Sequence, residues 1–324
     1  MTRRTGTSLI EVLVTVGILG IGLTSVIAMF PMAAITMGQA LKDDRTATAA
    51  VTADGLIRDM HWRNVVEPPA PLEPYFYAMD GVTMTGAPFP GLQPLAADGN
   101  PSYPVFVDPM GIVAGRGSVG DAGTPAASTS AIPRVTLKVV SDQPPGNQSS
   151  LALRLCSQMD GLSFDEDGNV PQPPSFEKRE LRYNWLWVVQ RPVNRDRLST
   201  TLRVVVFDKR VHLYRPPGFE TVFQTTFIPG QTSVTVAGTT AEVRKGSWVM
   251  DGTIGTDPAG RPIRHANFYR VLSVTTDINN NYVLELHTPI ARLDGRTEPY
   301  GGNLVVMPAV ADVYERPMVG GAGP

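Results

Sequence analysis

A single carboxylate near the start of a long apolar stretch is the feature with the clearest chemistry. Glu11 follows Gly6-Thr7-Ser8-Leu9-Ile10, and the thirty residues after it, Val12–Leu41, carry no formal charge. A charged side chain inside a membrane-spanning helix costs about 2.5–3.5 kcal/mol on insertion scales, so it is expected to have a partner of opposite charge. Cleavage between Gly6 and Thr7 would create one, because the new α-amino group, with an intrinsic pKa of about 7.7–8.0, would lie about one helical turn from Glu11. Between two staggered helices, the carboxylate of one neutralises the amine of the next. The pattern predicts self-assembly in lipid.

These residues resemble the processing and methylation motif of type IV prepilins and of the pseudopilins of type II secretion systems. The motif consists of Arg3-Arg4, Gly6, Glu11 and the long apolar run in that order, and the resemblance covers about the first 60 residues. It implies a leader peptide at residues 1–6, cleavage after Gly6, N-methylation of Thr7 and an assembly role for Glu11. The family usually has Phe at the position of Thr7. The implied partners are a prepilin peptidase and methylase, and other pilins or pseudopilins that contact the N-terminal helix.

Two other interpretations of the N-terminus remain. A secretory signal peptide also begins with positive charges, but its apolar core is about 7–15 residues long and excludes a carboxylate. The second is an ordinary single-pass anchor, in which Glu11 has no partner.

The apolar run predicts a helix at residues 7–63, about 85 Å long at the usual rise per residue. Its membrane span is expected at about residues 9–35, because about 20 apolar residues cross the hydrocarbon core. Gly17, Gly20 and Gly22 would let a neighbouring helix approach closely. Pro31 removes one backbone hydrogen bond and predicts a kink or an unwound turn. Arg3-Arg4 place the N-terminus in the cytoplasm, with the rest of the chain periplasmic or extracellular beyond the inner membrane.

Composition favours a β-rich exported domain. The chain has 324 residues, 29 Pro, 31 Gly and a net charge of −2, so no basic field indicates nucleic-acid binding. Cys156 is the one cysteine, which excludes an intrachain disulfide, and a buried inert thiol is expected. The expected fold class is α+β, with the long helix packed on an antiparallel β-sheet.

The chain after the helix divides into three expected segments. Residues 64–133 are a Pro/Gly-rich insertion, residues 134–215 a β-rich, pilin-like head, and residues 216–324 a further β-rich module. Strand-like alternation occurs at Val135–Val139 and over Glu180–Arg191, where Trp185 and Trp187 share one apolar face. Leu202–Phe207 suits a central strand, and Leu151–Ser157 a short helix. Further strands are expected at Val211–Tyr214, Val222–Ile228, Ser233–Val236, Ser247–Asp251, Phe268–Thr275, Tyr282–His287 and Leu304–Val313.

No motif indicates catalysis, a cofactor or a metal. Gly115–Gly120 matches G-x-G-x-x-G, but the residues after it cannot open the helix that such a phosphate site needs. Asp165–Asn169 offers oxygen ligands at alternate positions yet fails the EF-hand template, so a solvated turn is preferred and calcium binding stays open. The four histidines, His61, His212, His265 and His287, lack metal-ligand spacing.

The sequence therefore predicts a non-enzymatic minor pilin or pseudopilin of a type IV pilus or a type II secretion pseudopilus. The alternative is a membrane-anchored extracytoplasmic binding module that does not polymerise. A third hypothesis, an anchored hydrolase, has no supporting motif.

Overall fold

The computed structural model describes residues 8–66, 72–115, 132–158, 182–196, 199–208, 210, 220–237, 243–257, 259–292 and 297–319. The chain divides into two compact units, Met1–Ala47 and Thr48–Pro324. It is an α+β protein with a long N-terminal apolar helix and a mostly antiparallel β-domain, as predicted.

One helix, α1 (Leu9–Val66), provides the described part of the first unit and continues into the second. It contains 58 residues and confirms the long helix predicted at residues 7–63. Pro31 lies inside it without interrupting the helix, so the predicted unwound turn is absent. A single missing backbone bond is tolerated here because the turns on both sides remain paired.

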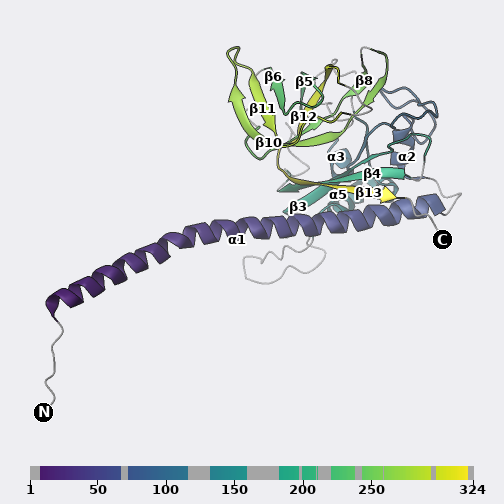
Figure 1. The fold of residues 1–324 in the computed structure, drawn as a ribbon. Coiled ribbons are helices and arrows are strands. Elements are labelled where there is room, and N and C mark those ends of the chain that lie inside the picture. The colour runs from purple at the N-terminus through teal and green to yellow at the C-terminus, as the bar shows by residue number, and fades with distance from the viewer. Residues whose placement is uncertain are drawn as a thin grey trace. The chain divides into compact units, whose positions relative to one another are not determined.

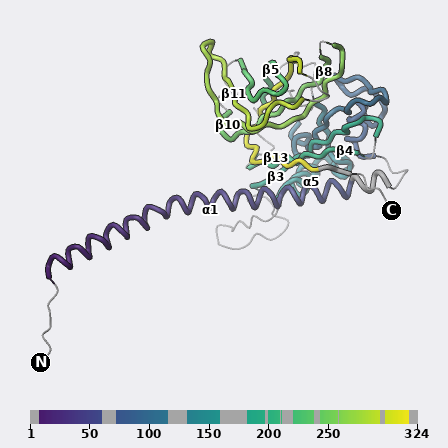
Figure 2. Tube along the Cα trace, viewed as in Figure 1, coloured from purple at the N-terminus to yellow at the C-terminus, as the bar shows by residue number. Residues whose placement is uncertain are grey.

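A five-stranded sheet forms the centre of the second unit, in the order β13-β4-β3-β1-β2. The pair β1–β2 is parallel and the other neighbouring pairs are antiparallel. Figure 2 shows the C-terminal strand, in yellow, near β4 and β3. The strands are β1 (Val105–Val107), β2 (Arg134–Val135), β3 (Tyr183–Gln190), β4 (Ser199–Asp208) and β13 (Val310–Val319).

This sheet takes strands from all three segments that the sequence suggested. Residues 64–133 supply β1, residues 134–215 supply β2, β3 and β4, and residues 216–324 supply β13. β4 is a central strand, as predicted for Leu202–Phe207, because β3 and β13 flank it. The Pro/Gly-rich segment therefore contributes to the core.

β3 is buried on both faces. Trp185, Trp187 and Val189 belong to the core on the side of α1, whereas Leu186 and Val188 belong to a second core on the opposite side. The alternation had predicted one apolar and one polar face, but every residue of β3 is buried. Layers on both sides of the sheet explain this difference.

Small residues let α1 approach the sheet closely. Ala49, Ala50, Ala53 and Ile57 are fully or almost fully buried, and the indole nitrogen of Trp187 donates a hydrogen bond of 2.9 Å to the carbonyl oxygen of Ala53. An alanine side chain leaves room for the backbone to meet the indole. The tryptophans are core residues, as expected from their spacing.

A six-stranded antiparallel sheet forms the second β-layer, in the order β5-β12-β7-β10-β11-β6. Its two end strands lie side by side, and the Thr225 hydroxyl donates to the carbonyl oxygen of Thr235 at 2.6 Å, so the sheet curls almost into a barrel (Figure 1). The strands are β5 (Thr221–Phe227), β6 (Ser233–Val236), β7 (Trp248–Asp251), β10 (Asn267–Thr276), β11 (Tyr282–Leu286) and β12 (Tyr300–Val306). We call this element the barrel.

Apolar contacts join the barrel to the five-stranded sheet. Leu186 and Val205 of the sheet share a core with Met250, Ala266 and Val305 of the barrel region. A small hairpin, β8 (Ile254–Thr256) and β9 (Pro262–Arg264), lies beside it. The second unit thus has three layers, formed by the end of α1, the five-stranded sheet and the barrel.

Short helices replace part of the predicted β-structure. Within the expected strand Val135–Val139, only the end of β2 forms, because α4 (Lys138–Ser141) begins before the expected strand ends. The backbone nitrogen of Lys138, the first residue of α4, donates a hydrogen bond to the Glu73 carboxylate at 2.8 Å. The helix predicted at Leu151–Ser157 is α5 (Pro145–Leu155), which begins earlier, at a proline suited to a first helical turn. The remaining helices are α2 (Pro74–Met79) and α3 (Pro109–Val113).

The contact between α1 and β3 predicts that substitutions on the buried and exposed sides of the helix change the free energy of unfolding by different amounts. Ala53→Leu should lower the free energy of unfolding by about 1–3 kcal/mol, because extra methylene groups at a closely packed site force the layers apart. Urea denaturation of the full chain in detergent, followed by tryptophan fluorescence, would measure this.

Val51→Leu is the matched control, since Val51 is 61% exposed. It should change the free energy of unfolding by less than about 0.5 kcal/mol. Equal effects of the two substitutions would contradict the packing described.

Candidate functional site

Glu11 lies in the first turn of α1, on an exposed part of the helix. Its backbone nitrogen donates to the Ser8 hydroxyl at 3.3 Å, so Ser8 caps the helix. Ser8-Leu9-Ile10-Glu11 also matches the S-x-x-E pattern of a capping box, a signal that the sequence analysis missed. Gly6 and Thr7, the predicted processing residues, lie outside the described residues.

The first part of α1 presents apolar side chains outward. Leu9, Ile18 and Phe30 are each at least 67% exposed, and the helix is long and apolar enough to cross a membrane. Its hydroxyls are satisfied within the helix: Thr15 donates to the Glu11 carbonyl oxygen at 2.7 Å and Thr24 to the Gly20 carbonyl oxygen at 2.8 Å. Such internal bonds lower the cost of placing hydroxyls in lipid. Glu11 is therefore the charged side chain that remains to be neutralised between Ser8 and Leu41.

The three glycines that were predicted to let a neighbouring helix approach have empty space beside them. A Cβ added at Gly17, Gly20 or Gly22 would meet no atom of the chain within 4 Å. Among the residues that the structure describes, nothing packs against these glycines, so they leave room for the close approach of a neighbouring helix.

A buried ion cluster lies at the end of β1, around Asp108. The Asp108 carboxylate accepts two hydrogen bonds from the Arg210 guanidinium, at 2.8 and 2.6 Å, and lies 3.5 Å from the Arg134 Nε. Arg134 also pairs with Glu220, just before β5. Gly111 donates its backbone N–H to Asp108, and a Cβ on Gly111 would overlap that carboxylate.

The charges of this cluster hold Asp108 ionised. Burial alone would raise its pKa, but the guanidinium groups of Arg210 and Arg134 outweigh burial and lower the pKa to about 2. The nearby Cys156 thiol has the opposite shift, because burial and the Asp108 charge raise its pKa well above the usual value. Cys156 is therefore an inert buried thiol, as predicted.

An Asp–His–Tyr cluster lies in the barrel and resembles part of a catalytic arrangement. His265 Nδ1 lies 2.8 Å from Asp251, and the Tyr300 hydroxyl donates to the same carboxylate at 2.7 Å. The other oxygen of Asp251 accepts from the Thr253 hydroxyl at 2.5 Å. All of these residues are buried, so the arrangement orders the connection between β7 and β12 and presents no reacting group to a substrate.

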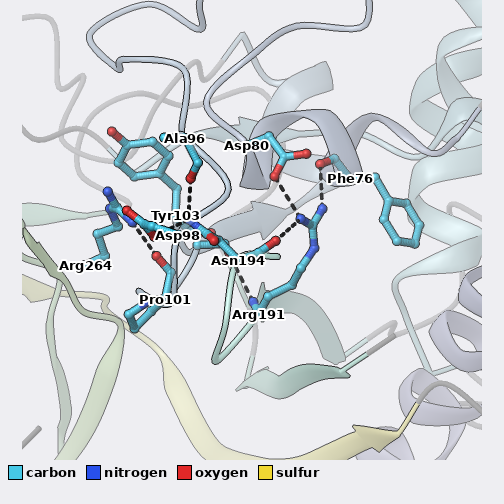
Figure 3. A network of polar contacts seen from close by, with 10 residues as sticks. Phe76, Asp80, Ala96, Asp98, Pro101, Tyr103, Arg191, Asn194 and Arg264 are labelled. Carbon is cyan, nitrogen blue, oxygen red and sulfur yellow. Dashed lines mark hydrogen bonds and ion pairs between the residues drawn. The ribbon is translucent and has the colours of Figure 1, made fainter. Parts of the chain in front are cut away.

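A further polar network attaches residues 72–103 to the sheet and the hairpin (Figure 3). Arg191, at the end of β3, donates to the Asp80 carboxylate at 2.8 Å and to the Phe76 carbonyl oxygen at 3.1 Å. Asn194 donates to the Ala96 carbonyl oxygen at 2.9 Å, and Arg264 to the Pro101 carbonyl oxygen at 2.5 Å. These side chains supply the backbone partners that a segment with little regular structure lacks.

A pocket of about 500 Å³ opens between the five-stranded sheet and the barrel. Arg203 of β4 and Glu315 of β13 line one side, and Trp248 of β7 lines the other. His287 also lines this pocket, although the sequence assigned it no role. Nothing in the sequence brought these residues together, because they come from strands far apart in the chain.

The other predicted motifs contribute no site. Among the described residues, no group of three or more His, Cys, Asp or Glu could hold a metal ion. The side chains of His61 and His212, residues 116–120 of the glycine motif and the acidic turn Asp165–Asn169 lie outside the described residues. The question of calcium binding at that turn therefore stays a prediction.

Comparisons with known proteins identify no family. No protein-family model and no curated protein matches the chain. A solved structure, the phage phi92 endosialidase, matches 42% of this chain and 18% of its own length, with 8% sequence identity and a TM-score of 0.19. The chain thus spans less than a fifth of that protein, and the low score carries no argument about fold or function.

The ion cluster predicts a specific acid sensitivity. The pKa of Asp108 is lower in the folded protein, so its stabilising contribution is complete above about pH 4 and is lost as the pH falls toward 2. Asp108→Asn should remove this loss of stability at low pH. It should also lower the free energy of unfolding at neutral pH by about 3–5 kcal/mol, because the buried guanidinium groups of Arg210 and Arg134 would lose the negative charge of Asp108 between them.

Urea denaturation of the full chain in detergent across this pH range would measure both effects. Asp142→Asn is the control, since Asp142 forms a surface pair with Lys138 and its side chain is 56% exposed. It should cost less than about 1 kcal/mol. A variant at position 108 that kept the acid sensitivity of the wild type would contradict this account.

Proposed function

We propose that the protein is a minor pilin or pseudopilin, a structural subunit of a type IV pilus or a type II secretion pseudopilus. In this proposal a prepilin peptidase cleaves after Gly6, Thr7 becomes the methylated N-terminus, and Glu11 neutralises the terminal amine of a neighbouring subunit. The β-domain then lies on the periplasmic or extracellular side of the inner membrane.

The observation that carries this proposal is a helix with two different surroundings. The residues around Glu11 expose apolar side chains, whereas Ala49, Ala53 and Ile57 of the same helix are buried against a β-sheet. A signal peptide requires no second half packed into a domain. An assembling subunit uses both halves, because one enters lipid or a bundle of helices and the other carries the domain.

The pattern of side chains within the exposed part supports assembly over a simple anchor. Glu11 is a charged group without an ion pair among the described contacts, and Gly17, Gly20 and Gly22 leave an open path for a second helix. The capping role of the Ser8-x-x-Glu11 pattern is the competing explanation. It needs only a polar side chain at position 11 and no partner subunit.

The second candidate function is a membrane-anchored binding module that does not polymerise. The pocket between the five-stranded sheet and the barrel favours it, because 500 Å³ suits a small ligand. This function requires the anchor and the pocket but makes no use of the charge of Glu11.

Substitution of Glu11 separates the two. With Glu11→Gln, which keeps a capping side chain and removes the charge, the fraction of protein recovered in sheared fibres or pseudopili should fall at least about tenfold, since an uncompensated amine remains in lipid. Membrane insertion should be unchanged. Asp43→Asn, which removes an acidic charge beyond the apolar run, is the matched control and should assemble normally. Normal assembly of Glu11→Gln would favour the binding module or a capping role.

Processing is tested independently. Mass spectrometry of the protein purified from its native membrane should give a chain that begins at Thr7 and carries one extra methyl group. Gly6→Val should leave the leader attached, because a branched side chain at the cleavage residue obstructs the peptidase. A native chain that begins at Met1, or beyond the apolar run, would contradict the proposal.

A further inference from the structure

The C-terminal strand β13 forms a long edge of the five-stranded sheet. It has ten residues and pairs with β4 on one side, and among the described residues no strand pairs with its other side. The other ends of the two large sheets are less open, because β2 has two residues and the end strands of the barrel lie side by side. A long open edge presents backbone groups on which another chain can add a strand.

The pairing of β3 fixes the direction of the backbone groups across the sheet. The backbone nitrogen of Trp185 donates to the Cys156 carbonyl oxygen at 2.9 Å, so the odd-numbered residues of β3 bond on the side away from β4. Direction alternates along a strand, so the even-numbered residues of β3 bond to β4. Leu186 and Val205 form one such pair, which places the bonds from odd-numbered residues of β4 toward β3.

The same alternation determines which groups of β13 face outward. The even-numbered residues of β4 bond to β13, and Val204 is opposite Tyr314, so the even-numbered residues of β13 bond to β4. The backbone groups of Val313, Glu315 and Pro317 therefore face the outer edge.

Two residues remove hydrogen-bond donors from this outer edge. The Asp312 carboxylate accepts a hydrogen bond of 2.9 Å from the backbone nitrogen of Val313, so this N–H is occupied from within the chain. Pro317 has no N–H, and its position opposite Thr201 turns its nitrogen outward. In the described structure, the Glu315 N–H is the donor that remains between Val313 and Pro317.

The blocked positions lie where a second copy of the chain would pair. In an antiparallel pair centred on Glu315, this residue would face its equivalent in the other copy, and Val313 would face Pro317 on each side. Each of these flanking pairs would lack both hydrogen bonds, because one N–H is occupied and the other is missing. The two Glu315 carboxylates would also lie opposite each other, and like charges at such positions are unfavourable.

We propose that Asp312 and Pro317 close the outer edge of β13 to strand addition by a second copy of this chain. The Asp312 carboxylate is an internal cap that an added strand would have to displace. A closed edge keeps β-domains that are crowded on a membrane from joining their sheets. Closure of this edge is a property of the β-domain and does not depend on the assembly role of Glu11.

Sedimentation of the full chain in detergent tests this proposal. The double variant Asp312→Ala/Pro317→Ala regains both N–H groups. It should dimerise at least about tenfold more tightly than the wild type, because each restored hydrogen bond occurs twice in a symmetric pair. If this variant kept the wild-type tryptophan fluorescence and showed no gain in dimerisation, the proposal would be overturned.

The matched control is the double variant Asp142→Ala/Pro289→Ala. It removes one carboxylate and one proline at exposed positions outside β13, so it should sediment as the wild type does. Equal dimerisation of the two double variants would assign the effect to lost charge and proline in general, against the proposal.

A further variant separates the capping bond from the charge. Asp312→Asn/Pro317→Ala keeps a capping oxygen at position 312 and removes the negative charge. It should dimerise at least about threefold more weakly than Asp312→Ala/Pro317→Ala, because the Val313 N–H stays occupied. Equal dimerisation of these two variants would overturn the role of the cap.

A cysteine cross-link shows where the two copies pair. Glu315→Cys in the Asp312→Ala/Pro317→Ala background should form a disulfide between copies, since facing Cα atoms of a hydrogen-bonded pair lie about 5.5 Å apart. Arg316→Cys in the same background is the control and should not cross-link, because it faces a different residue. Cys156 is buried and does not interfere. Dimers in which neither or both of the introduced cysteines cross-link would contradict pairing through β13.

Amide hydrogen exchange tests the cap in the wild-type chain, without reliance on a dimer. Relative to their intrinsic rates, the Val313 N–H should exchange more slowly than the Glu315 N–H, although both face the outer edge. Asp312→Ala should speed exchange at Val313 about two- to tenfold, because one hydrogen bond is lost. Exchange at Tyr314, which bonds to β4, should stay slow. Equal exchange at Val313 and Glu315 in the wild type would overturn the proposal.

Discussion

The arrangement of the β-domain depends on one strand that is buried on both faces. β3 carries Trp185 and Trp187 toward α1 and Leu186 and Val188 toward the barrel, so it requires an apolar layer on each side. Removal of either layer would expose large apolar side chains, at roughly 1.5–3 kcal/mol for each residue. This constraint explains why α1 must supply small residues at the point where it meets the indole of Trp187.

The polar clusters serve the same arrangement. Asp108 connects the end of β1 to Arg134 of β2 and to Arg210, which follows β4, and Arg134 continues the connection to Glu220 before β5. Such a buried network is costly if incomplete, which makes it sensitive to a misplaced strand. The Arg191 network likewise holds the segment that contains α2 in place. This segment has little regular structure, and Arg191 supplies a hydrogen-bond partner for its backbone. Charge thus determines the position of elements that apolar packing alone would leave free.

The two ends of the molecule have different chemistry, and the two proposals reflect this. Around Glu11, apolar surface and a lone carboxylate suit a lipid phase and a second helix. In the β-domain, charged side chains pair with one another in buried clusters, and a pocket opens between the five-stranded sheet and the barrel. A subunit that assembles through one end and binds a ligand through the other would combine both, and either property can exist without the other.

The sequence was sufficient to predict those helices and strands whose formation depends mainly on neighbouring residues in the chain. The long helix was predicted from an uninterrupted apolar run, and the central strand β4 from Leu202–Phe207, because periodicity and length depend on neighbouring residues alone. The inert character of Cys156 followed from its apolar surroundings in the same way. The strand predicted at Val135–Val139 was wrong beyond Val135, because the Glu73 carboxylate binds the Lys138 backbone from 65 residues away.

Only the tertiary structure shows the features that depend on contacts between residues far apart in the sequence. The near closure of the barrel, the union of three sequence segments in one sheet and the double burial of β3 all depend on which strands pair, and alternation along a strand carries no information about its neighbour. The pocket had no sequence signal at all, because Arg203 and Glu315 come together only through the long-range pairing of β4 with β13, and Trp248 lies on β7 of the other sheet. Local patterns show what a segment is able to form, whereas the free energy of burying it against a partner selects the fold.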